Sequence, residues 1–384
     1  MAADMRMHVL MTADTVGGVW THALELARGL ARDGVGIALA TMGAPLTPQQ
    51  RRDAGRIGNL TLHESTHRLE WMADPWHDVS AAGEWLLRLE AELRPDLVHL
   101  NQFAFGALPF CAPTLLVAHS CVLSWWRAVH GAPAPSSWDR YRDVVRHGLV
   151  GADLVGAPSR AMLDSLQTEY GHDAAAGLVL PNGRSGVEFA PACKEPFILA
   201  AGRLWDEAKN LAALEAVAPE LGWPVLVAGP TSTPSGTDRV TTGVQALGEL
   251  APEALARRFA AASIYALPAR YEPFGQTVLE AALSGCALVL GDIPSLREIW
   301  DCAALYVRPD DHAALRDMLR RLIDDPELRR RQSARALARA SAFTPERMVD
   351  AYRRAYERLL AARVDDGRRQ HAPVMPAMEP ACAS

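Results

Sequence analysis

Short apolar runs of valine, isoleucine and leucine alternate with amphipathic helical stretches along most of this chain, and this alternation allows few folds. The runs are apolar throughout rather than at every second residue, which is typical of strands buried on both faces of a parallel sheet. Those in the first half are HVLM from His8, VGIALAT from Val35, DLVHL from Asp96, TLLVAH from Thr114, DLVGAP from Asp153 and GLVLPN from Gly177. The pattern predicts an α/β fold with a doubly wound sheet.

The same pattern begins again near residue 196, which predicts a second α/β domain. Its runs are PFILAAG from Pro196, PVLVAG from Pro224, SIYALP from Ser263, CALVLG from Cys286 and AALYV from Ala303. The segment PACKEP has two prolines and no apolar period, so we place the domain boundary there. The predicted parts are an N-terminal domain at 1–190, a C-terminal domain at 191–344, a helix at 345–364 and a disordered tail at 365–384 that is rich in proline, alanine and methionine.

The overall composition excludes several classes of protein. Of the 384 residues, 49% are apolar and 22% are charged, which is close to the average for globular chains. The formal charge of −6 gives no electrostatic case for binding nucleic acid, and peripheral contact with a membrane is open but not indicated. The six cysteines form no Cys-x-x-Cys pair, and no apolar run reaches about 18 residues. We therefore expect a cytoplasmic protein without structural zinc, disulfides or a membrane span.

The strongest signal for a site is YEPFGQTVLEAA, which directly follows the predicted strand SIYALP. Glu272 lies at the end of that strand, and Glu280 lies about two turns into the helix that Pro273-Phe274-Gly275 opens. Two carboxylates at this spacing suit the two ends of an elongated ligand. One of them could instead be a helix N-terminal charge. Glu280 is harder to explain in that way, because burying an unpaired carboxylate in the apolar run TVLEAAL is costly.

Two glycines and two cations are expected at the same edge of the sheets. A turn with Gly17 and Gly18 presents backbone amides and a positive helix end where phosphate binds in open α/β sheets, although the glycines could also serve the turn alone. Arg203 follows the strand FILAAG and Lys209 opens the next helix, so both can offset the charge of a diphosphate leaving group. Of the 39 basic residues only Lys194 and Lys209 are lysines, which indicates that a compact ammonium is wanted at Lys209.

Together these motifs resemble the family 4 retaining glycosyltransferases of the GT-B fold, over roughly residues 5–362. The resemblance rests on AGRLWDEAKN, the loop ALGEL, YEPFGQTVLEA, GDIPSLREIW and the run LYVRPDD. It implies two Rossmann-like domains that face a central cleft, with the last helix, around residues 345–363, crossing back onto the N-terminal domain. The C-terminal domain would bind the nucleotide sugar, and the N-terminal domain would form the acceptor side.

The resemblance also implies roles for individual residues. Glu272 and the amides after it would hold the donor sugar, and Glu280 would bind the ribose hydroxyls. The base would meet the backbone of the ALGEL loop. The implied catalytic residues are His119, Arg203, Lys209 and Glu272, and the implied donor-binding residues are Gly17, Gly18, Asn182, Leu247, Gly248, Pro273, Phe274, Gly275, Gln276, Thr277 and Glu280.

Two segments depart from the family's pattern. Asn182 and Gly183 match a Pro-Asn-Gly motif, but GRSGVEF follows where a shorter Val-Asp segment is usual. Ser120 and Cys121 follow His119 where the family often has a paired carboxylate. The resemblance therefore assigns no role to residues 184–188.

A string with the spacing of a zinc site points to a different chemistry. His63-Glu64-Ser65-Thr66-His67 matches H-E-x-x-H, which binds zinc only when a helix brings both imidazoles to one face. It follows the alternating segment NLTL, which predicts a strand, so the required helix is missing. No Asp-x-Asp triplet occurs, which disfavours the metal-dependent type of glycosyltransferase. We therefore expect neither a divalent metal nor another cofactor.

The sequence thus predicts a metal-independent, retaining, hexosyltransferase-like enzyme of glycan or glycoconjugate biosynthesis. It would move a sugar from a nucleoside diphosphate sugar to a hydroxyl-bearing sugar, lipid or small-molecule acceptor. Because a fold does not fix a function, a nucleotide-sugar epimerase or phosphorylase stays open, as does a nucleotide-sugar-binding subunit without catalysis. The donor sugar, the acceptor and the base (UDP, GDP or ADP) also stay open.

Overall fold

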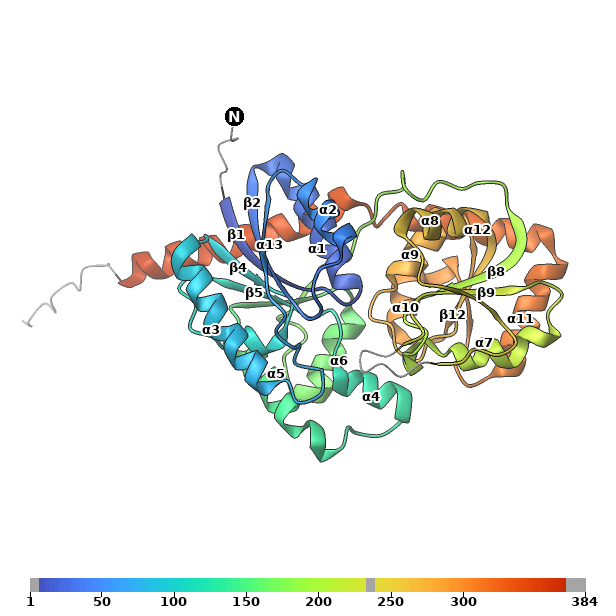
Figure 1. Cartoon of the computed structure of the whole chain (residues 1–384), viewed down its shortest axis with the longest axis horizontal. Coiled ribbons are helices and arrows are strands. Elements are labelled where there is room, and N and C mark those ends of the chain that lie inside the picture. The colour runs from blue at the N-terminus through green and yellow to red at the C-terminus, as the bar shows by residue number, and fades with distance from the viewer. Residues whose placement is uncertain (1–6, 233–238, 371–384) are drawn as a thin grey trace, which may run out of the picture.

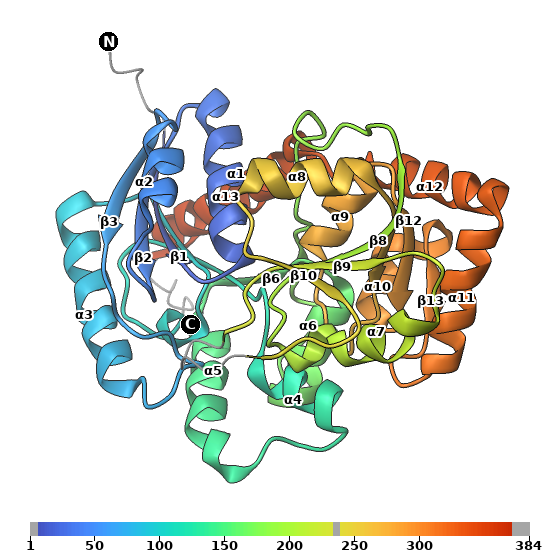
Figure 2. The same ribbon diagram turned by 45° about the vertical axis from the view of Figure 1, so that its right-hand side comes forward.

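The computed structural model describes residues 7–232 and 239–370 of the chain. It contains two separate parallel sheets, each with helices on both faces, and the two domains lie side by side (Figures 1 and 2). The predicted doubly wound α/β architecture is therefore confirmed. The helices within these two ranges include none with the length and apolarity to cross a membrane.

The first sheet has the strand order β3-β2-β1-β4-β5-β6-β7, and all neighbouring strands are parallel. Because the order reverses at β1, a topological switch point lies between β1 and β4, where open α/β sheets bind ligands outside the carboxyl ends. The strands are β1 (Met7–Asp14), β2 (Val35–Met42), β3 (Leu60–Glu64), β4 (Leu97–Leu100), β5 (Thr114–Val117), β6 (Leu154–Ala157) and β7 (Leu178–Val179). The helices are α1 (Gly18–Leu30), α2 (Pro48–Gly55), α3 (Trp76–Leu93), α4 (Val122–His130), α5 (Asp139–Gly151) and α6 (Arg160–Tyr170).

The second sheet has the order β10-β9-β8-β11-β12-β13, also with parallel neighbours, and its switch point lies between β8 and β11. The strands are β8 (Glu195–Ala201), β9 (Val225–Ala228), β10 (Gln245–Gly248), β11 (Ala262–Leu267), β12 (Ala287–Gly291) and β13 (Leu305–Val307). The helices are α7 (Leu211–Val217), α8 (Pro252–Ala261), α9 (Gln276–Leu283), α10 (Pro294–Trp300), α11 (His312–Asp324) and α12 (Pro326–Ala340). The expected loop ALGEL contains the edge strand β10, whose exposed residues form no apolar run.

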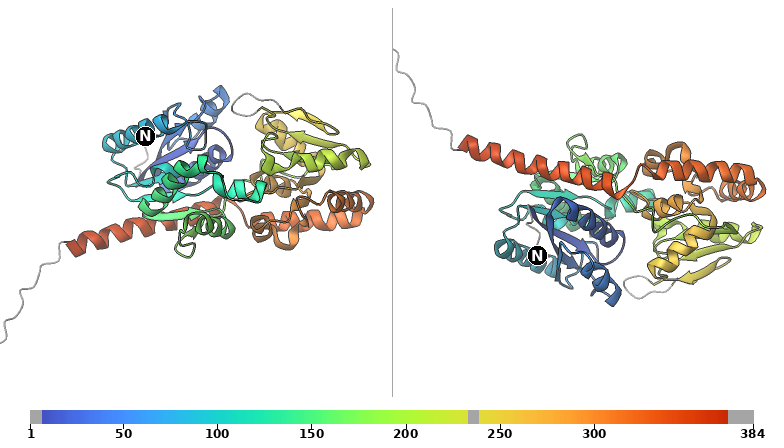
Figure 3. Two further views of the ribbon diagram at one scale, coloured as in Figure 1. Left: turned by 90° about the horizontal axis from the view of Figure 1, so that it is seen from below. Right: turned by 90° about the horizontal axis from the view of Figure 1, so that it is seen from above.

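The last helix, α13 (Pro345–Gln370), leaves the second domain and packs along the first (Figure 3). Val349, Tyr352 and Tyr356 lie in the same buried cluster as Val9 of β1. The helix approaches α1 so closely that a Cβ on Gly29 would lie 2.1 Å from Val349 Cγ2. This close contact holds α13 against the first domain.

The helix is longer than the sequence pattern indicates. It continues to Gln370, so the expected end at residue 364 is too early and the prediction of disorder is wrong for residues 365–370. Once a helix has formed, each added residue gains a hydrogen bond without a new nucleation cost, and no proline interrupts this segment. The rest of the predicted tail, residues 371–384, lies outside the described residues.

Candidate active site

The carboxyl edges of the two sheets face each other and make direct contacts. Trp125 of α4 donates its indole N–H to Asp206 Oδ1 of the second domain at 2.9 Å. The backbone amide of Cys121 donates to the Tyr271 hydroxyl at 3.0 Å. Beside these contacts lies a cavity of about 280 Å³, lined from both domains by residues such as Met162 and Pro273. The loops that follow the strands therefore meet at an interdomain cleft, as the switch-point rule predicts.

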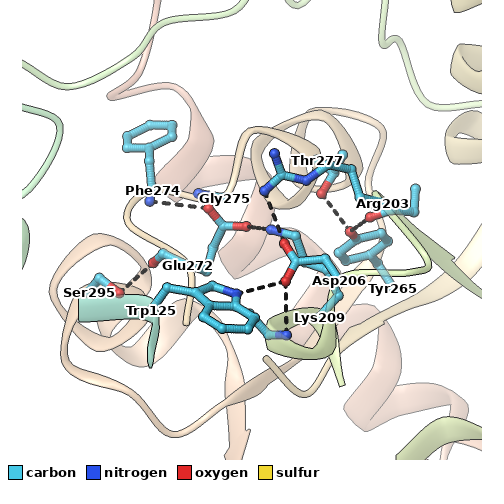
Figure 4. Close-up of polar contacts among 12 residues, drawn as sticks. Trp125, Arg203, Asp206, Lys209, Tyr265, Glu272, Phe274, Gly275, Thr277 and Ser295 are labelled. Atoms are coloured by element: carbon cyan, nitrogen blue, oxygen red, sulfur yellow. Dashed lines mark hydrogen bonds and ion pairs between the residues drawn. The ribbon is translucent and has the colours of Figure 1, made fainter. Parts of the chain in front are cut away.

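Glu272 lies in the loop between β11 and α9, with its carboxylate at the N-terminus of the helix (Figure 4). Its Oε1 accepts the backbone amides of Gly275 at 2.9 Å and Phe274 at 3.4 Å. Its Oε2 accepts from Lys209 Nζ at 2.6 Å, and its carbonyl oxygen accepts from the Ser295 hydroxyl at 2.5 Å. The Gly275 backbone has φ +88°, which favours glycine at this turn. The carboxylate is thus held rigidly where the helix field favours negative charge.

Arg203 and Lys209 come together around a buried carboxylate that the sequence analysis missed (Figure 4). Asp206 Oδ2 accepts from Arg203 Nη2 at 3.0 Å, and Oδ1 accepts from the amide of Ala208 at 3.0 Å as well as from Trp125. Burial alone would raise the pKa of Asp206, but the charges of Lys209 and Arg203 and the bond from Trp125 hold it below its usual range. Lys209 ends a short 3-10 turn before α7 rather than opening that helix.

The two cations are therefore each paired with a carboxylate: Arg203 with Asp206, and Lys209 with Glu272. Together the four side chains carry no net charge. An anionic ligand at this place would meet two preorganised donors that already hold their positions through these pairs.

His119 follows β5 and is held as a neutral ring. Its Nε2 lies 2.7 Å from Asn101 Oδ1, and Asn101 Nδ2 donates to the carbonyl oxygen of Thr12 at 2.6 Å. This second bond orients the amide so that Oδ1 faces His119, and His119 Nε2–H is then the donor. Burial lowers the pKa of His119 well below its usual value, and the neighbouring His22 and His99 lower it further. Nδ1 is accordingly left as an acceptor.

Asn182 lies apart from the residues around Glu272. It is next to His22, whose ring centroid is 4.7 Å from that of His119 in an edge-on contact. Asn182 Oδ1 is buried without a hydrogen-bond partner among the described residues. The structure thus places Asn182 beside His22, which in turn contacts the His119 ring.

The two predicted glycines lie across the cleft from Arg203. Gly17 precedes α1 with φ +130°, and a Cβ built on it would lie 3.6 Å from Arg203 Nη1. A Cβ on Gly18 would meet nothing within 4 Å, so this turn is open. Glycine is therefore favoured at residue 17 by its backbone conformation, since a Cβ would make only an ordinary van der Waals contact with the guanidinium.

The remaining predicted donor residues line the same edge of the second sheet. Leu247 and Gly248 end the edge strand β10, where Gly248 has φ +68° and its carbonyl oxygen accepts the amide of Gly229 at 2.9 Å. Gln276 opens α9 directly after Pro273-Phe274-Gly275, and Thr277 Oγ1 lies 2.7 Å from the Tyr265 hydroxyl. These residues lie at or after the carboxyl ends of β10 and β11, which are on one edge of the sheet because neighbouring strands are parallel.

Glu280 lies farther along α9, where its carboxylate pairs with Arg184. Only 6% of it is exposed, and its Oε1 accepts from Arg184 Nε at 3.1 Å. Burial raises the pKa of Glu280 to about 7, although Arg184 lowers it. Arg184 lies in the segment to which the family resemblance assigns no role.

One more carboxylate lies at the cleft without having been predicted. Asp14 ends β1, and its Oδ1 is buried with no hydrogen-bond partner in the described part of the chain. Burial raises its pKa to about 6, and Arg203 opposes this shift. The signal that could have found it is its position, since it is a carboxylate at the end of the central strand and directly before the glycine turn.

The H-E-x-x-H string does not form a zinc site geometry. His63 and Glu64 belong to strand β3, as predicted from NLTL, and Glu64 accepts from Arg51 Nη2 at 2.8 Å. His67 Nδ1 lies 3.8 Å from Asp78 Oδ1. Among the residues that the structure describes, no three His, Cys, Asp or Glu side chains are grouped so that they could hold a metal ion.

Two family models match successive parts of the chain. The model described as Glycosyltransferase Family 4 matches residues 16–185, and the model described as Glycosyl transferases group 1 matches residues 195–325. Glycogen synthase from Mycobacterium tuberculosis is 26% identical over 405 residues, with 95% of each chain covered. D-inositol 3-phosphate glycosyltransferase from Nocardia farcinica is 25% identical over 408 residues, covering 93% of this chain and 89% of that one.

Solved structures show the same arrangement of both domains. Sucrose-phosphate synthase from Thermosynechococcus elongatus superposes with a TM-score of 0.76 at 20% identity, covering 93% of this chain and all of that one (100%). HepE from Anabaena in complex with UDP and glucose has a TM-score of 0.70 at 15% identity, with 92% of this chain and 100% of that chain covered. These similarities show that the fold is GT-B.

Proposed function

This chain belongs to the family 4 glycosyltransferases of the GT-B fold, and we propose that it transfers its sugar with retention of anomeric configuration and without a divalent metal. Family membership makes the donor a nucleotide sugar and the acceptor a sugar. It also makes glycan biosynthesis the context of the reaction. The stereochemistry, the role of each site residue and the identity of the acceptor belong to the proposal.

The observation that carries the proposal is the pair Arg203 and Lys209 at the carboxyl edge of the second sheet. Arg203 faces the N-terminal glycine turn of α1, and Lys209 Nζ lies 2.6 Å from Glu272 at the N-terminus of α9. A leaving diphosphate gains negative charge as its bond to the sugar breaks, and two fixed cations stabilise that charge. They supply the electrostatic compensation that a divalent cation gives in other enzymes.

We infer a front-side reaction, in which attack and departure occur on the same face of the sugar. The acceptor oxygen forms a bond to the anomeric carbon while the bond from that carbon to the diphosphate oxygen breaks. The acceptor's hydroxyl proton passes to the departing phosphate oxygen, so no protein base is needed. His119 Nδ1 is suited to accept a hydrogen bond from a donor-sugar hydroxyl, because its ring is neutral. Glu272 would hold the sugar ring with the amides that follow it.

The relatives narrow the first substrates to test. Their names include glycogen synthase, alpha-maltose-1-phosphate synthase from Mycolicibacterium smegmatis and sucrose-phosphate synthase, and HepE is described with UDP and glucose. We propose a glucosyl donor and a sugar or sugar phosphate acceptor. UDP-glucose, ADP-glucose and GDP-glucose with glucose phosphates and short glucans form the first panel.

The test measures release of nucleoside diphosphate in EDTA, with and without each acceptor, and the anomeric proton of the product by NMR. We expect release that depends on the acceptor and a product with the anomeric configuration of the donor. An inverted product would refute the retaining mechanism, and activity that returns only with manganese or zinc would refute metal independence. An isomerised donor, a requirement for inorganic phosphate, or tight nucleotide binding without turnover would favour an epimerase, a phosphorylase or a non-catalytic subunit.

A further inference from the structure

The chain crosses between its two domains at two places that touch each other. One crossing segment follows β7, and the other joins α12 to α13. A Cβ on Gly183 would lie 2.4 Å from the carbonyl oxygen of Thr344, so only glycine allows the segments to pass. The amide of Arg184 donates to the carbonyl oxygen of Phe343 at 3.0 Å. The backbone of Arg184 is thus fixed at the junction of the domains.

From this junction the Arg184 guanidinium reaches both domains. Its Nη1 donates to Glu25 Oε1 of α1 at 2.7 Å, and its Nε donates to Glu280 Oε1 of α9 at 3.1 Å. It also lies over the ring of Phe189 at 5.0 Å and 3.4 Å from Glu188 Oε2. The side chains of Arg184, Glu25 and Glu280 are 10%, 6% and 9% exposed, so these are contacts with little water around them.

Each of the two joined helices points its N-terminus into the cleft. Glu25 lies two turns into α1, which begins at the glycine turn opposite Arg203, and Glu280 lies one turn into α9, which begins beside Glu272. Arg184 therefore bridges the inner parts of the helices whose outer ends form the two walls of the active site.

The charges in this cluster show what Arg184 does for Glu280. Burial raises the pKa of Glu280, the Arg184 charge lowers it, and the Glu188 and Glu25 charges raise it again. Burial raises the pKa of Tyr265, and the charges of Glu272 and Glu280 raise it further, so Tyr265 adds no charge to this cluster. Without Arg184, a buried Glu280 would have only carboxylates for charged neighbours and would be protonated at neutral pH. A carboxylate accepts up to about four hydrogen bonds, so one guanidinium contact leaves room for ribose hydroxyls.

We propose that Arg184 is a positioning residue of the nucleotide site: it holds the Glu280 carboxylate ready for the ribose hydroxyls and, through Glu25, fixes α1 relative to α9. This inference rests on the proposed function, because the ribose contact of Glu280 is part of that function. It gives a task to a residue in the segment that departs from the family's sequence pattern.

The test compares binding of UDP, ADP and GDP with binding of their 2′,3′-dideoxy forms to the full chain by calorimetry. For each base, the dissociation constant of the dideoxy form divided by that of the ribose form measures the contribution of the ribose hydroxyls to binding. In the wild type we expect the dideoxy form to bind about 10- to 100-fold more weakly, the usual cost of losing hydrogen bonds to a carboxylate. In Arg184→Gln and in Glu280→Gln the ratio should fall to within about threefold of unity. In the double variant Arg184→Gln/Glu280→Gln, the ratio should be no lower than in either single variant.

Two more variants separate positioning from stability. Glu25→Gln leaves the Arg184–Glu280 bond intact, so the ratio should stay at the wild-type value while kcat falls about tenfold because α1 is no longer fixed. Arg329→Gln is the matched control, since Arg329 also lies over an aromatic ring, Trp223, at 4.8 Å and donates to the Leu322 carbonyl oxygen, away from both helices. It should change neither the ratio nor kcat.

The inference is overturned if Arg184→Gln weakens ribose and dideoxy nucleotides equally and keeps the wild-type ratio. Should that variant fail to fold, Arg184→Lys gives the same comparison, because a single ammonium keeps the charge but does not bond Glu25 and Glu280 at once. A wild-type ratio near unity would also overturn it while leaving the glycosyltransferase activity intact. If the wild type binds none of the three nucleotides, the proposed function itself fails.

Discussion

The substitution Lys209→Arg tests the electrostatic role of the cleft most directly. Lys209 Nζ donates to Glu272 Oε2 at 2.6 Å, and 17% of the lysine side chain is exposed. Its stem packs on the Gly202 backbone, where a Cβ would lie 3.7 Å from Lys209 Cε. Arginine keeps the charge but places it on a longer side chain with a planar guanidinium, which cannot follow the same path along the Gly202 backbone to Glu272.

The expected loss follows from this geometry. At an effective dielectric constant of about 20, two unit charges at 4 Å interact by about 4 kcal/mol, and moving the charge centre to 5 Å costs about 1 kcal/mol. Misdirecting one preorganised donor at a developing charge adds up to about 3 kcal/mol. Together these effects predict a fall in kcat of about 10- to 1,000-fold. Binding of the intact nucleotide sugar should change less, because its diphosphate gains the extra negative charge only as the bond to the sugar breaks.

The assay is steady-state release of nucleoside diphosphate, with the affinity for the intact nucleotide sugar measured separately by calorimetry in the absence of acceptor. Lys194→Arg is the matched control, since Lys194 is the other lysine of the chain and its Nζ donates to the carbonyl oxygens of Ala260 at 2.9 Å and Ser284 at 2.5 Å, outside the cleft. It should leave kcat within about twofold of the wild type. Wild-type turnover by Lys209→Arg would remove Lys209 from the mechanism and leave Arg203 as the proposed diphosphate cation.

Three further outcomes follow from buried groups. Burial raises the pKa of Glu70 from 4.5 to about 7. The protonated side chain therefore stabilises the fold below pH 4.5, and this contribution is lost as the pH rises through about 7. Between these pH values, the melting temperature of the wild type should fall relative to that of Glu70→Gln. Tyr352→Ala removes a fully buried ring between α13 and the first domain and should cost about 3–5 kcal/mol in urea unfolding. Trp125→Phe deletes the indole donor to Asp206 and should lower kcat about tenfold without lowering the melting temperature by more than about 4 °C.

The sequence predicted the elements that carry a strong local pattern. Both sheets follow from apolar runs, and the stripe of α13 that packs against α1 follows from the spacing of its aromatic residues. The run GLVLPN correctly predicted the two-residue strand β7, but the edge strand β10 was taken for a loop because its exposed residues form no apolar run. The end of α13 was placed too early because composition alone does not tell a continued helix from a tail.

The sequence predicted those site residues that lie at the carboxyl end of a strand. That rule brought Glu272, Arg203 and Lys209 to one edge, where the structure also has them. It did not predict the bond from Trp125 to Asp206 across 81 positions, or from Arg184 to Glu280 across 96 positions. Such pairs depend on how the domains dock, and one sequence carries no local pattern for that.

The charge balance of the cleft indicates where the binding energy for a diphosphate comes from. Arg203 and Lys209 are already paired with Asp206 and Glu272, so a ligand exchanges partners with these carboxylates rather than meeting bare cations. The additional attraction must come from backbone amides at helix N-termini. Both α1 and α9 begin after a glycine with positive φ, and neither has a side-chain cap hydrogen bond. Because glycine supplies no capping oxygen, the first amides of α1 and α9 stay available for an anion, whereas Glu272 accepts the amides of Phe274 and Gly275 that precede α9. A capping side chain at Gly17, as in Gly17→Ser, would compete with the diphosphate for these amides and would also strain the turn, so we expect both the nucleotide affinity and the melting temperature to fall.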